Sequence, residues 1–549
     1  MKFSDLHTHN HMRAHFWMQE NPKRFTKKKS FSPWTVIAAN RKAYKKGKMG
    51  ASYSQADLVR SWNANVRLSF NSLYPLERQF VRGKKFKAGK DKWYQFLVSH
   101  ASSHKYPLRD FIQTFYMRIP DEAVNYFQSD DYDYWESLNR EMKFVYSESG
   151  NRIKKNKIFT PGAIRRLVES ERKRRRKYPL ENEANNAQYF IPKSKTELKK
   201  SLDSDDEITM VITIEGAHAL GTDRESIDEI SKRVQEIKKD WPMPVFFITF
   251  AHHFDNKLCG HAHSIPDTGK LLLDQTVGKN KRFYPEGFRI ARELLGLDAN
   301  NKRDKSLGYR ILLDVKHMSA AARKDYYEKI VKPAMADGDV IPVIGSHCAY
   351  SGRPSLDKHI ELQSSERDDS CELCGDESKL SKAGKKALAN SMTPGKFNSW
   401  NINLCDEDIE VIVKTGGLFG LSFDQRILGL KSKDPKQRNG IQLIWENIEA
   451  IAKAAYEKTQ LTDEEKPQIW KCLTIGTDFE GLIDPPDKYP SVLQFRSVAE
   501  QLIEEIEKTR KAKKPKYLSH LKNAQDTRAL VEDFAFNNAV AFVRKHYPK

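Results

Sequence analysis

The sequence predicts an α/β protein, a (β/α)8 TIM barrel with large helical and loop insertions. Three observations support this fold class. Eight short apolar runs recur along the chain, helical patterns lie between several of them, and most of the runs end at histidine, glutamate or aspartate. The carboxyl ends of barrel strands carry the reacting groups of such proteins, so the third observation also marks a candidate site.

The predicted strands are mostly continuous apolar runs, which is typical of parallel strands buried on both faces. In chain order they are Phe3–Leu6, Val66–Phe70, Thr209–Ile214, Val245–Phe250, Arg310–Val315, Val340–Gly345, Gly417–Ser422 and Cys472–Gly476. Between them, helical patterns occur in Ser226–Lys239, Ala320–Ala334 and Asp406–Lys414. This alternation of strand and helix is what a (β/α)8 barrel requires.

Two intervals are too long for a bare barrel, and we predict them as insertions in a single domain that spans residues 1–549. The first covers about residues 76–206 and is basic and helical; the second covers about residues 354–400. Both are interpreted as enlarged βα loops, which surround the active-site face of a barrel.

The first insertion has its own predicted elements. Helices are expected near Asp110–Arg118 and over Pro161–Lys177, and the polar segment Glu181–Asp206 is expected to be a mobile connector.

Cysteine usage gives no disulfide framework, because only six cysteines occur in 549 residues. Cys371 and Cys374 form one CxxC pair in the second insertion, without a second pair to complete four ligands. The pair is interpreted as an ordinary loop pair, with a zinc knuckle as the alternative.

The formal net charge of +21 is concentrated in basic stretches between residues 23 and 177. Two interpretations stay open: solvated helix faces, or contact with nucleic acid through its phosphates, for which no recognisable module is present. No apolar run approaches the roughly 20 residues of a membrane span, and the first residues lack the apolar core of a secretory signal. We therefore expect a cytoplasmic protein with no membrane span.

The first predicted strand ends in the sequence DLHTHNH. His7 and His9 are two residues apart, so on a strand both point to the same side and can chelate one metal ion. Glu215 ends the third strand, where a carboxylate can bridge two cations through its two oxygens.

Other strands end in comparable groups. They are His252 and His253 after the fourth, His317 after the fifth, His347 after the sixth and Asp478 after the eighth. Asp5 and Asp314 lie inside strands and are expected to orient ligand histidines. Five further histidines are expected to be outer-sphere or surface groups: His11, His15, His218, His261 and His263.

In this order the motifs resemble those of the membrane (renal) dipeptidase family of zinc metallopeptidases, within the amidohydrolase-like barrels. The matching segments are YSQADLVRSWNANVRLSFNSLYP, GSHCAYS, NINLCDEDIEVIVKTGGLFGLSF, IGTDFEG and the closing YPSVLQFRSVAEQLIEE and EDFAFNNAVAFVRKHY. The resemblance covers nearly the whole chain apart from the two insertions.

The resemblance implies two divalent metal ions, expected to be Zn²⁺. His7, His9 and Glu215 would hold the first ion, and Glu215, His317 and His347 would hold the second. The metals would activate water to attack an amide carbonyl.

The resemblance also implies two catalytic residues. His252 would contact the substrate and stabilise its developing oxyanion, and Asp478 would act as the acid and base. A dipeptide-like substrate and a homodimer are further implications.

This chain departs from the family pattern at two important positions. His9 stands where the family usually has aspartate. Ile402 replaces an arginine linked to recognition of the substrate carboxylate, and Arg353 is one candidate to replace that arginine.

Two rival interpretations remain. A histidine pair near the N-terminus also opens the polymerase-and-histidinol-phosphatase type of phosphoesterase, although the last motif, DFEG, lacks the terminal histidine of that family. Alternatively, the barrel could be a non-catalytic scaffold whose basic insertions bind nucleic acid or a partner protein.

Overall fold

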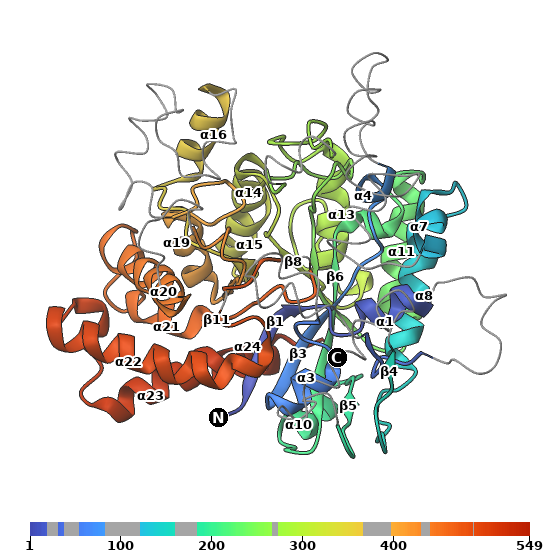
Figure 1. Ribbon diagram of the computed structural model, residues 1–549. Helices are drawn as coiled ribbons and strands as arrows, with labels where there is room; N and C mark the ends of the chain where they lie inside the picture. Colours follow the sequence, from blue (N-terminus) through green and yellow to red (C-terminus); the bar gives the residue numbers. More distant parts are fainter. Residues whose placement is uncertain are drawn as a thin grey trace, which may run out of the picture.

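The computed structural model describes residues 1–18, 31–37, 54–82, 121–159, 184–265, 273–365, 397–429, 440–481, 483–486 and 488–548. Within these ranges eight parallel strands form a nearly closed barrel surrounded by helices (Figure 1). The strands are β1 (Phe3–Thr8), β3 (Val66–Leu73), β6 (Ile208–Glu215), β7 (Val245–Thr249), β8 (Leu312–Asp314), β9 (Ile344–Cys348), β10 (Leu418–Leu421) and β11 (Leu473–Ile475). The predicted fold class and all eight predicted strands are confirmed.

Neighbouring strands in the barrel are also consecutive among these eight in the chain. The longest regular pairing joins β3 to β6, from Leu68 opposite Thr209 to Leu73 opposite Ile214. The barrel closes beyond the end of β11, where Thr8 pairs with Phe479 and the amide of Asp478 donates to the carbonyl of His7 at 3.0 Å.

Strand β9 begins later than predicted, at Ile344 instead of Val340. Pro342 explains the shift, because proline has no amide hydrogen to donate to a neighbouring strand. The shift places His347 inside the strand and not beyond its end.

Helices cover the barrel on its outside. In the first half they are α1 (Met12–Met18), α3 (Leu58–Asn63), α4 (Gln79–Arg82), α7 (Asp121–Gln128), α8 (Tyr134–Tyr146), α10 (Lys195–Leu202), α11 (Ile227–Lys239) and α13 (Pro285–Leu295). In the second half they are α14 (Ala320–Tyr326), α15 (Lys332–Ala336), α16 (Leu356–Ser365), α19 (Asp406–Thr415), α20 (Gly440–Glu457), α21 (Ile469–Cys472), α22 (Phe495–Lys513), α23 (Ala524–Glu532) and α24 (Asn538–His546).

Helices form in all three segments between the barrel strands where the sequence predicts them. The predicted helix Ser226–Lys239 is α11, with Ser226 as its N-cap. The helix predicted over Ala320–Ala334 is α14 continued through a π-helical turn, Tyr327–Val331, into α15.

Parts of the first insertion are ordered against the barrel. The segment predicted as a connector instead forms β5 (Tyr189–Phe190), which pairs with β6, and helix α10. Two further short strands, β2 (Val36–Ile37) and β4 (Ile158–Phe159), pair with each other. The predicted helices Asp110–Arg118 and Pro161–Lys177, and the pair Cys371 and Cys374, lie outside the described residues.

The inside of the barrel is apolar away from the carboxyl ends of its strands. A buried cluster joins side chains of seven strands to helix α24: Leu6, Leu68, Phe70, Val211, Phe247, Leu312, Ile344, Leu418, Ala539, Phe542 and Val543. Burial of such side chains stabilises the barrel and leaves its other mouth for polar groups.

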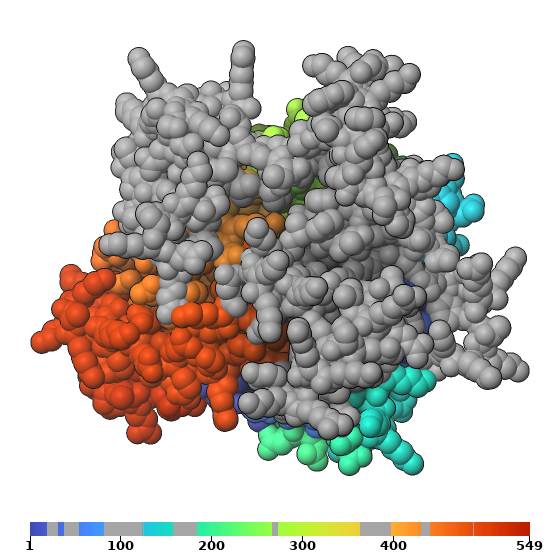
Figure 2. Space-filling view, in the orientation of Figure 1, coloured from blue at the N-terminus to red at the C-terminus, as the bar shows by residue number. Residues whose placement is uncertain are grey.

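The C-terminal helices α22 and α23 pack on each other and form the red part of the molecular surface in Figure 2. Among the described residues, no helix combines the length and the apolar character that crossing a membrane requires.

Candidate metal centre

The structure brings all seven predicted site residues together at the carboxyl ends of the strands. They are His7 in β1, His9 just after it, Glu215 at the end of β6, His252 after β7, His317 after β8, His347 in β9 and Asp478 after β11. All are buried except Asp478, whose side chain is 15% exposed. The cluster therefore has low access to water, which strengthens the interactions of its charges.

Glu215 lies at the centre of this cluster. Its Oε1 is 3.2 Å from Nε2 of His7, and its Oε2 is 2.9 Å from Nε2 of His9. Nε2 of His317 and of His347 lie 3.8 and 3.7 Å from Oε1, and these two nitrogens are 3.2 Å apart. One carboxylate thus faces two pairs of imidazoles, as a bridging ligand would.

The ring of His9 is fixed from its far side. Its Nδ1 lies 3.0 Å from the carbonyl oxygen of Ser72, which can only accept a hydrogen bond. A neutral His9 ring therefore presents the lone pair of Nε2 to the carboxylate of Glu215. Two acceptors at 2.9 Å repel each other unless a proton or a cation lies between them.

These residues fit a divalent transition metal. In the described part of the chain, Nε2 of His7 and Nε2 of His9 are buried and make no hydrogen bond of acceptable geometry. Imidazole nitrogen together with carboxylate oxygen is the donor set that Zn²⁺ and similar ions prefer. One four-residue group suited to a cation consists of His7, Glu215, His347 and Asp478.

The ring of His347 is held through a hydroxyl group. Ser346 Oγ donates to Asp314 Oδ2 at 2.5 Å and lies 2.7 Å from Nδ1 of His347. Because the hydroxyl proton goes to Asp314, Nδ1 of His347 donates to Oγ and Nε2 stays free for a ligand. Asp314 therefore fixes the ring of His347 through Ser346.

Asp5 has a different partner from the one predicted. Its carboxylate accepts from the amide and hydroxyl of Thr477, at 2.9 and 2.5 Å, and from the amide of His7 at 3.3 Å. Burial raises the pKa of Asp5 to about 7. Asp5 thus joins β1 to the end of β11, and in the described part of the chain these hydrogen bonds involve no imidazole ring.

Asp478 lies at the edge of the cluster. Its carboxylate oxygens are 3.8 Å from Nε2 of His7 and 3.9 Å from Nε2 of His347. Burial and then the negative charge of Glu215 raise the pKa of Asp478 well above its usual range. Asp478 and His317 both have positive φ angles, 63° and 64°, a strained backbone that occurs often at functional sites.

Glu77 is a site residue that the sequence did not reveal. This buried residue follows β3, and its Oε2 accepts from Nδ1 of His252 at 2.5 Å. Burial alone would lower the pKa of His252, but the carboxylates of Glu77 and Glu215 raise it to about 10. Nε2 of His252 lies 3.4 Å from Oε1 of Glu215.

The accessory histidines lie inside the protein, and none is on the surface. His11 and His15 pack near helix α8, where Nε2 of His11 lies 2.7 Å from Oε1 of Glu141. His218 lies beside His252 and contacts the carbonyl of Pro75 through Nε2 at 2.8 Å. The remaining two, His261 and His263, are also buried.

Ile402, and Arg353 as the candidate to replace the arginine that the sequence lacks there, are both buried. Ile402 is 2% exposed and Arg353 has no exposed surface. The backbone carbonyl of Arg353 accepts from the amide of Asp406 at 3.0 Å.

Comparison with known proteins finds no matching family model and no matching curated protein. Solved structures similar to this chain include a metallopeptidase from Rhodobacter sphaeroides with a phosphinate mimic of the dipeptide L-Ala-D-Ala (12% identity, 100% of this chain and 99% of that chain, TM-score 0.45). A dipeptidase described as a metallopeptidase has 11% identity, the same coverages and a TM-score of 0.45. An amidohydrolase from Pseudomonas aeruginosa has 12% identity, coverages of 94% and 99%, and a TM-score of 0.41.

Proposed function

We propose that this chain is a metal-dependent hydrolase that cleaves an amide bond in a small, dipeptide-like substrate. The observation that carries the proposal is the convergence of the buried Glu215 carboxylate with Nε2 atoms of His7, His9, His317 and His347. Nε2 of His7 and Nε2 of His9 are buried without a hydrogen bond among the described residues, and a bound cation would give both of them a partner.

His7, His9 and Glu215 would hold one divalent ion, and Glu215, His317 and His347 would hold a second, both expected to be Zn²⁺. When bound, such ions polarise a carbonyl oxygen and lower the pKa of water to near neutrality. The protein contributes fixed ring orientations, which raise metal affinity because the ligands need little rearrangement.

His252 is proposed to stabilise the negative charge that develops on the substrate carbonyl oxygen. Its Nδ1 is held by Glu77 at 2.5 Å, which leaves Nε2–H directed toward the cluster as a donor. A positioned donor in a buried site lowers the energy of such a charge more than water does.

Asp478 is proposed to move the reaction's proton. Its carboxylate takes a proton from the attacking water and returns it to the nitrogen of the leaving amine. The partial exposure of its side chain, unlike the full burial of the histidines, is what a group that meets substrate needs.

The test is a substrate panel of dipeptides, β-lactam-like amides and phosphate esters, applied to Zn²⁺-loaded protein and to the variant Glu215→Gln. We expect hydrolysis of an amide by the wild type and none above background by the variant. Hydrolysis of phosphate esters alone would support the phosphoesterase alternative, and no hydrolysis at all would support the scaffold.

A further inference from the structure

The loop after β7 carries two adjacent histidines, and the proposed reaction uses only the first. His253, the second, is partly exposed, and its ring lies 4.1 Å from the ring of His252 and 4.8 Å from that of His317. The side chain of Phe80 packs edge-on against it at 5.2 Å. His253 therefore lies beside two residues of the cluster, His252 and His317.

A hydrogen-bond network fixes His253 in this place. Its Nδ1 lies 2.7 Å from Oγ of Ser264. Nε2 of Gln275 donates to the same Oγ at 2.7 Å and to the carbonyl of His253 at 2.5 Å. Because Nδ1 is committed to Ser264, Nε2 is the nitrogen of His253 that remains available.

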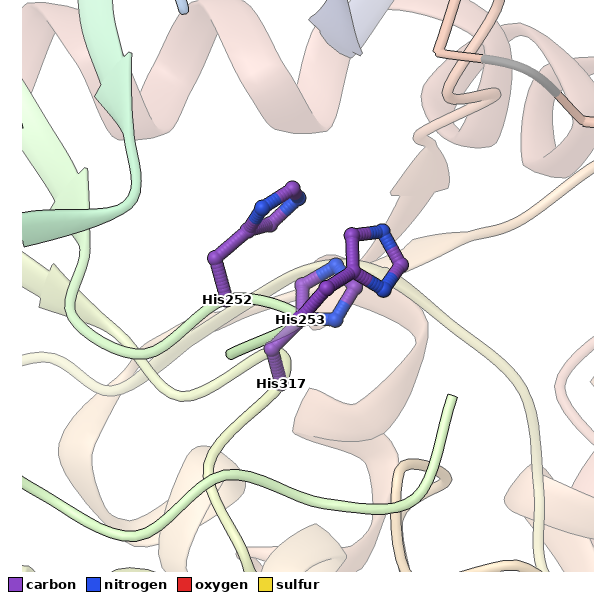
Figure 3. A group of neighbouring side chains, drawn as sticks. All are labelled: His252, His253 and His317. Atoms are coloured by element: carbon purple, nitrogen blue, oxygen red, sulfur yellow. The ribbon is translucent and has the colours of Figure 1, made fainter. Parts of the chain in front are cut away.

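Of the other two rings, that of His252 is held in a similar way and that of His317 has a free nitrogen among the described residues. Glu77 holds Nδ1 of His252, an arrangement of carboxylate and imidazole that commonly supports a metal ligand. Nδ1 of His317 is buried and makes no hydrogen bond in the part of the chain that the structure describes. Figure 3 shows the three rings gathered at one place, on the loops that follow β7 and β8.

The geometry points to a three-imidazole position for a nitrogen-preferring divalent cation, such as Zn²⁺ or Cu²⁺, formed by His252, His253 and His317. One nitrogen of each ring lies within 4.8 Å of the other two. Tetrahedral coordination at a metal–nitrogen distance of about 2.0–2.1 Å needs nitrogens about 3.3 Å apart, so binding would draw the three rings together. Three protein ligands leave a fourth position for water or a substrate atom.

This position has a consequence for regulation, which rests on the proposed function. A cation there occupies Nε2 of His252, the atom proposed to donate to the substrate oxygen. It also takes His317 from the second ion of the Glu215 cluster. Excess Zn²⁺ is therefore expected to inhibit hydrolysis, and removal of His253 is expected to relieve that inhibition.

The test isolates this position in the full-length variant Glu215→Gln, which lacks the bridging carboxylate. We expect it to bind one Cu²⁺ per chain, with three imidazole nitrogens counted by electron paramagnetic resonance. Adding His253→Asn to this variant should remove one of the nitrogens that coordinate Cu²⁺ and weaken Cu²⁺ binding at least 10-fold. Ser264→Ala, a milder change, should weaken it about 10-fold by releasing the ring, and the exposed control His520→Asn should change nothing.

Two results overturn the inference: no Cu²⁺ bound by Glu215→Gln, or the same affinity and nitrogen count with and without His253. If the wild type still binds Zn²⁺ in an amount that Glu215→Gln reduces, the proposed function survives this failure. A wild type that binds no Zn²⁺ overturns both.

Discussion

The carboxylate of Glu215, at the end of β6, lies within 4 Å of the Nε2 atoms of several buried histidines. Hydrogen bonds on the far sides of His9 and His347 turn their Nε2 atoms toward this carboxylate. The residues of the candidate site could be predicted from sequence because each lies near the carboxyl end of a strand, where parallel strands converge. Glu77 could not, because it follows β3 by four residues in a loop whose path the sequence does not define.

The first residue-scale prediction concerns Asp478→Asn. Asparagine has the same shape and tolerates a positive φ, so the backbone at this position is kept. We expect bound metal to be retained while kcat falls about 100- to 10,000-fold, the usual contribution of a general acid–base. Metal analysis and steady-state kinetics on the substrate found by the panel provide the check. Undiminished turnover would show that another group moves the proton.

The second concerns Glu77→Gln, which removes the negative partner of His252 but keeps a side chain of equal size. We expect kcat/KM to fall about 10- to 100-fold, as for other partners that orient a site histidine. A purely structural role predicts a lower melting temperature with unchanged kinetics instead. Thermal melts recorded beside the kinetics separate these two results.

At the scale of elements, helices α1 and α8 meet beside the site. The strands and three of the helices could be predicted from apolar patterns in the sequence alone. The packing of α8 could not, because it depends on contacts between residues far apart in the chain. Glu141 of α8 accepts from the amide of Tyr74 at 2.8 Å and pairs with His11. This part of the predicted insertion thereby packs beside the candidate site, which no local sequence pattern indicates.

The burial of His15 between α1 and α8 predicts that stability depends on pH. Burial lowers the pKa of His15 to about 4, although the charge of Glu141 opposes the shift. An unfolded histidine titrates near pH 6.5, so between about pH 6.5 and 4 the unfolded chain binds a proton that the folded chain does not. The contribution of His15 to stability is therefore present above pH 6.5 and is lost as the pH falls toward 4.

Replacing His15 with Gln should remove this dependence. Between pH 7 and 4.5 we expect the free energy of unfolding of the wild type to fall by about 2–3 kcal/mol more than that of His15→Gln. Urea unfolding at both pH values measures the difference. Parallel decreases in the two proteins would mean that His15 is not buried in its neutral form.

At the scale of the whole molecule, the contacts that close the barrel also bring two residues of the candidate site together. The ends of β1 and β11 carry His7 and Asp478, and Asp5 joins them through Thr477. We expect Thr477→Val to lower the free energy of unfolding by about 1–3 kcal/mol, because it leaves buried polar groups without a partner. It should also weaken metal binding, since the two ends separate.

Thr474→Val is the matched control, three residues earlier, in β11. Thr474 is fully buried, and its hydroxyl has no hydrogen-bond partner among the described residues, so this change should be neutral or stabilising. Urea unfolding of both variants provides the comparison. Equal destabilisation by the two substitutions would argue against a specific role for the bond between Asp5 and Thr477.

The metal content of the protein tests the central claim most directly. Full-length wild type and Glu215→Gln would be loaded with Zn²⁺, dialysed into metal-free buffer without chelator and measured by inductively coupled plasma mass spectrometry. The account predicts about two Zn²⁺ per wild-type chain, since Glu215 can bridge two ions, and the loss of at least one in the variant. A wild type that retains no transition metal, like its variant, would contradict it.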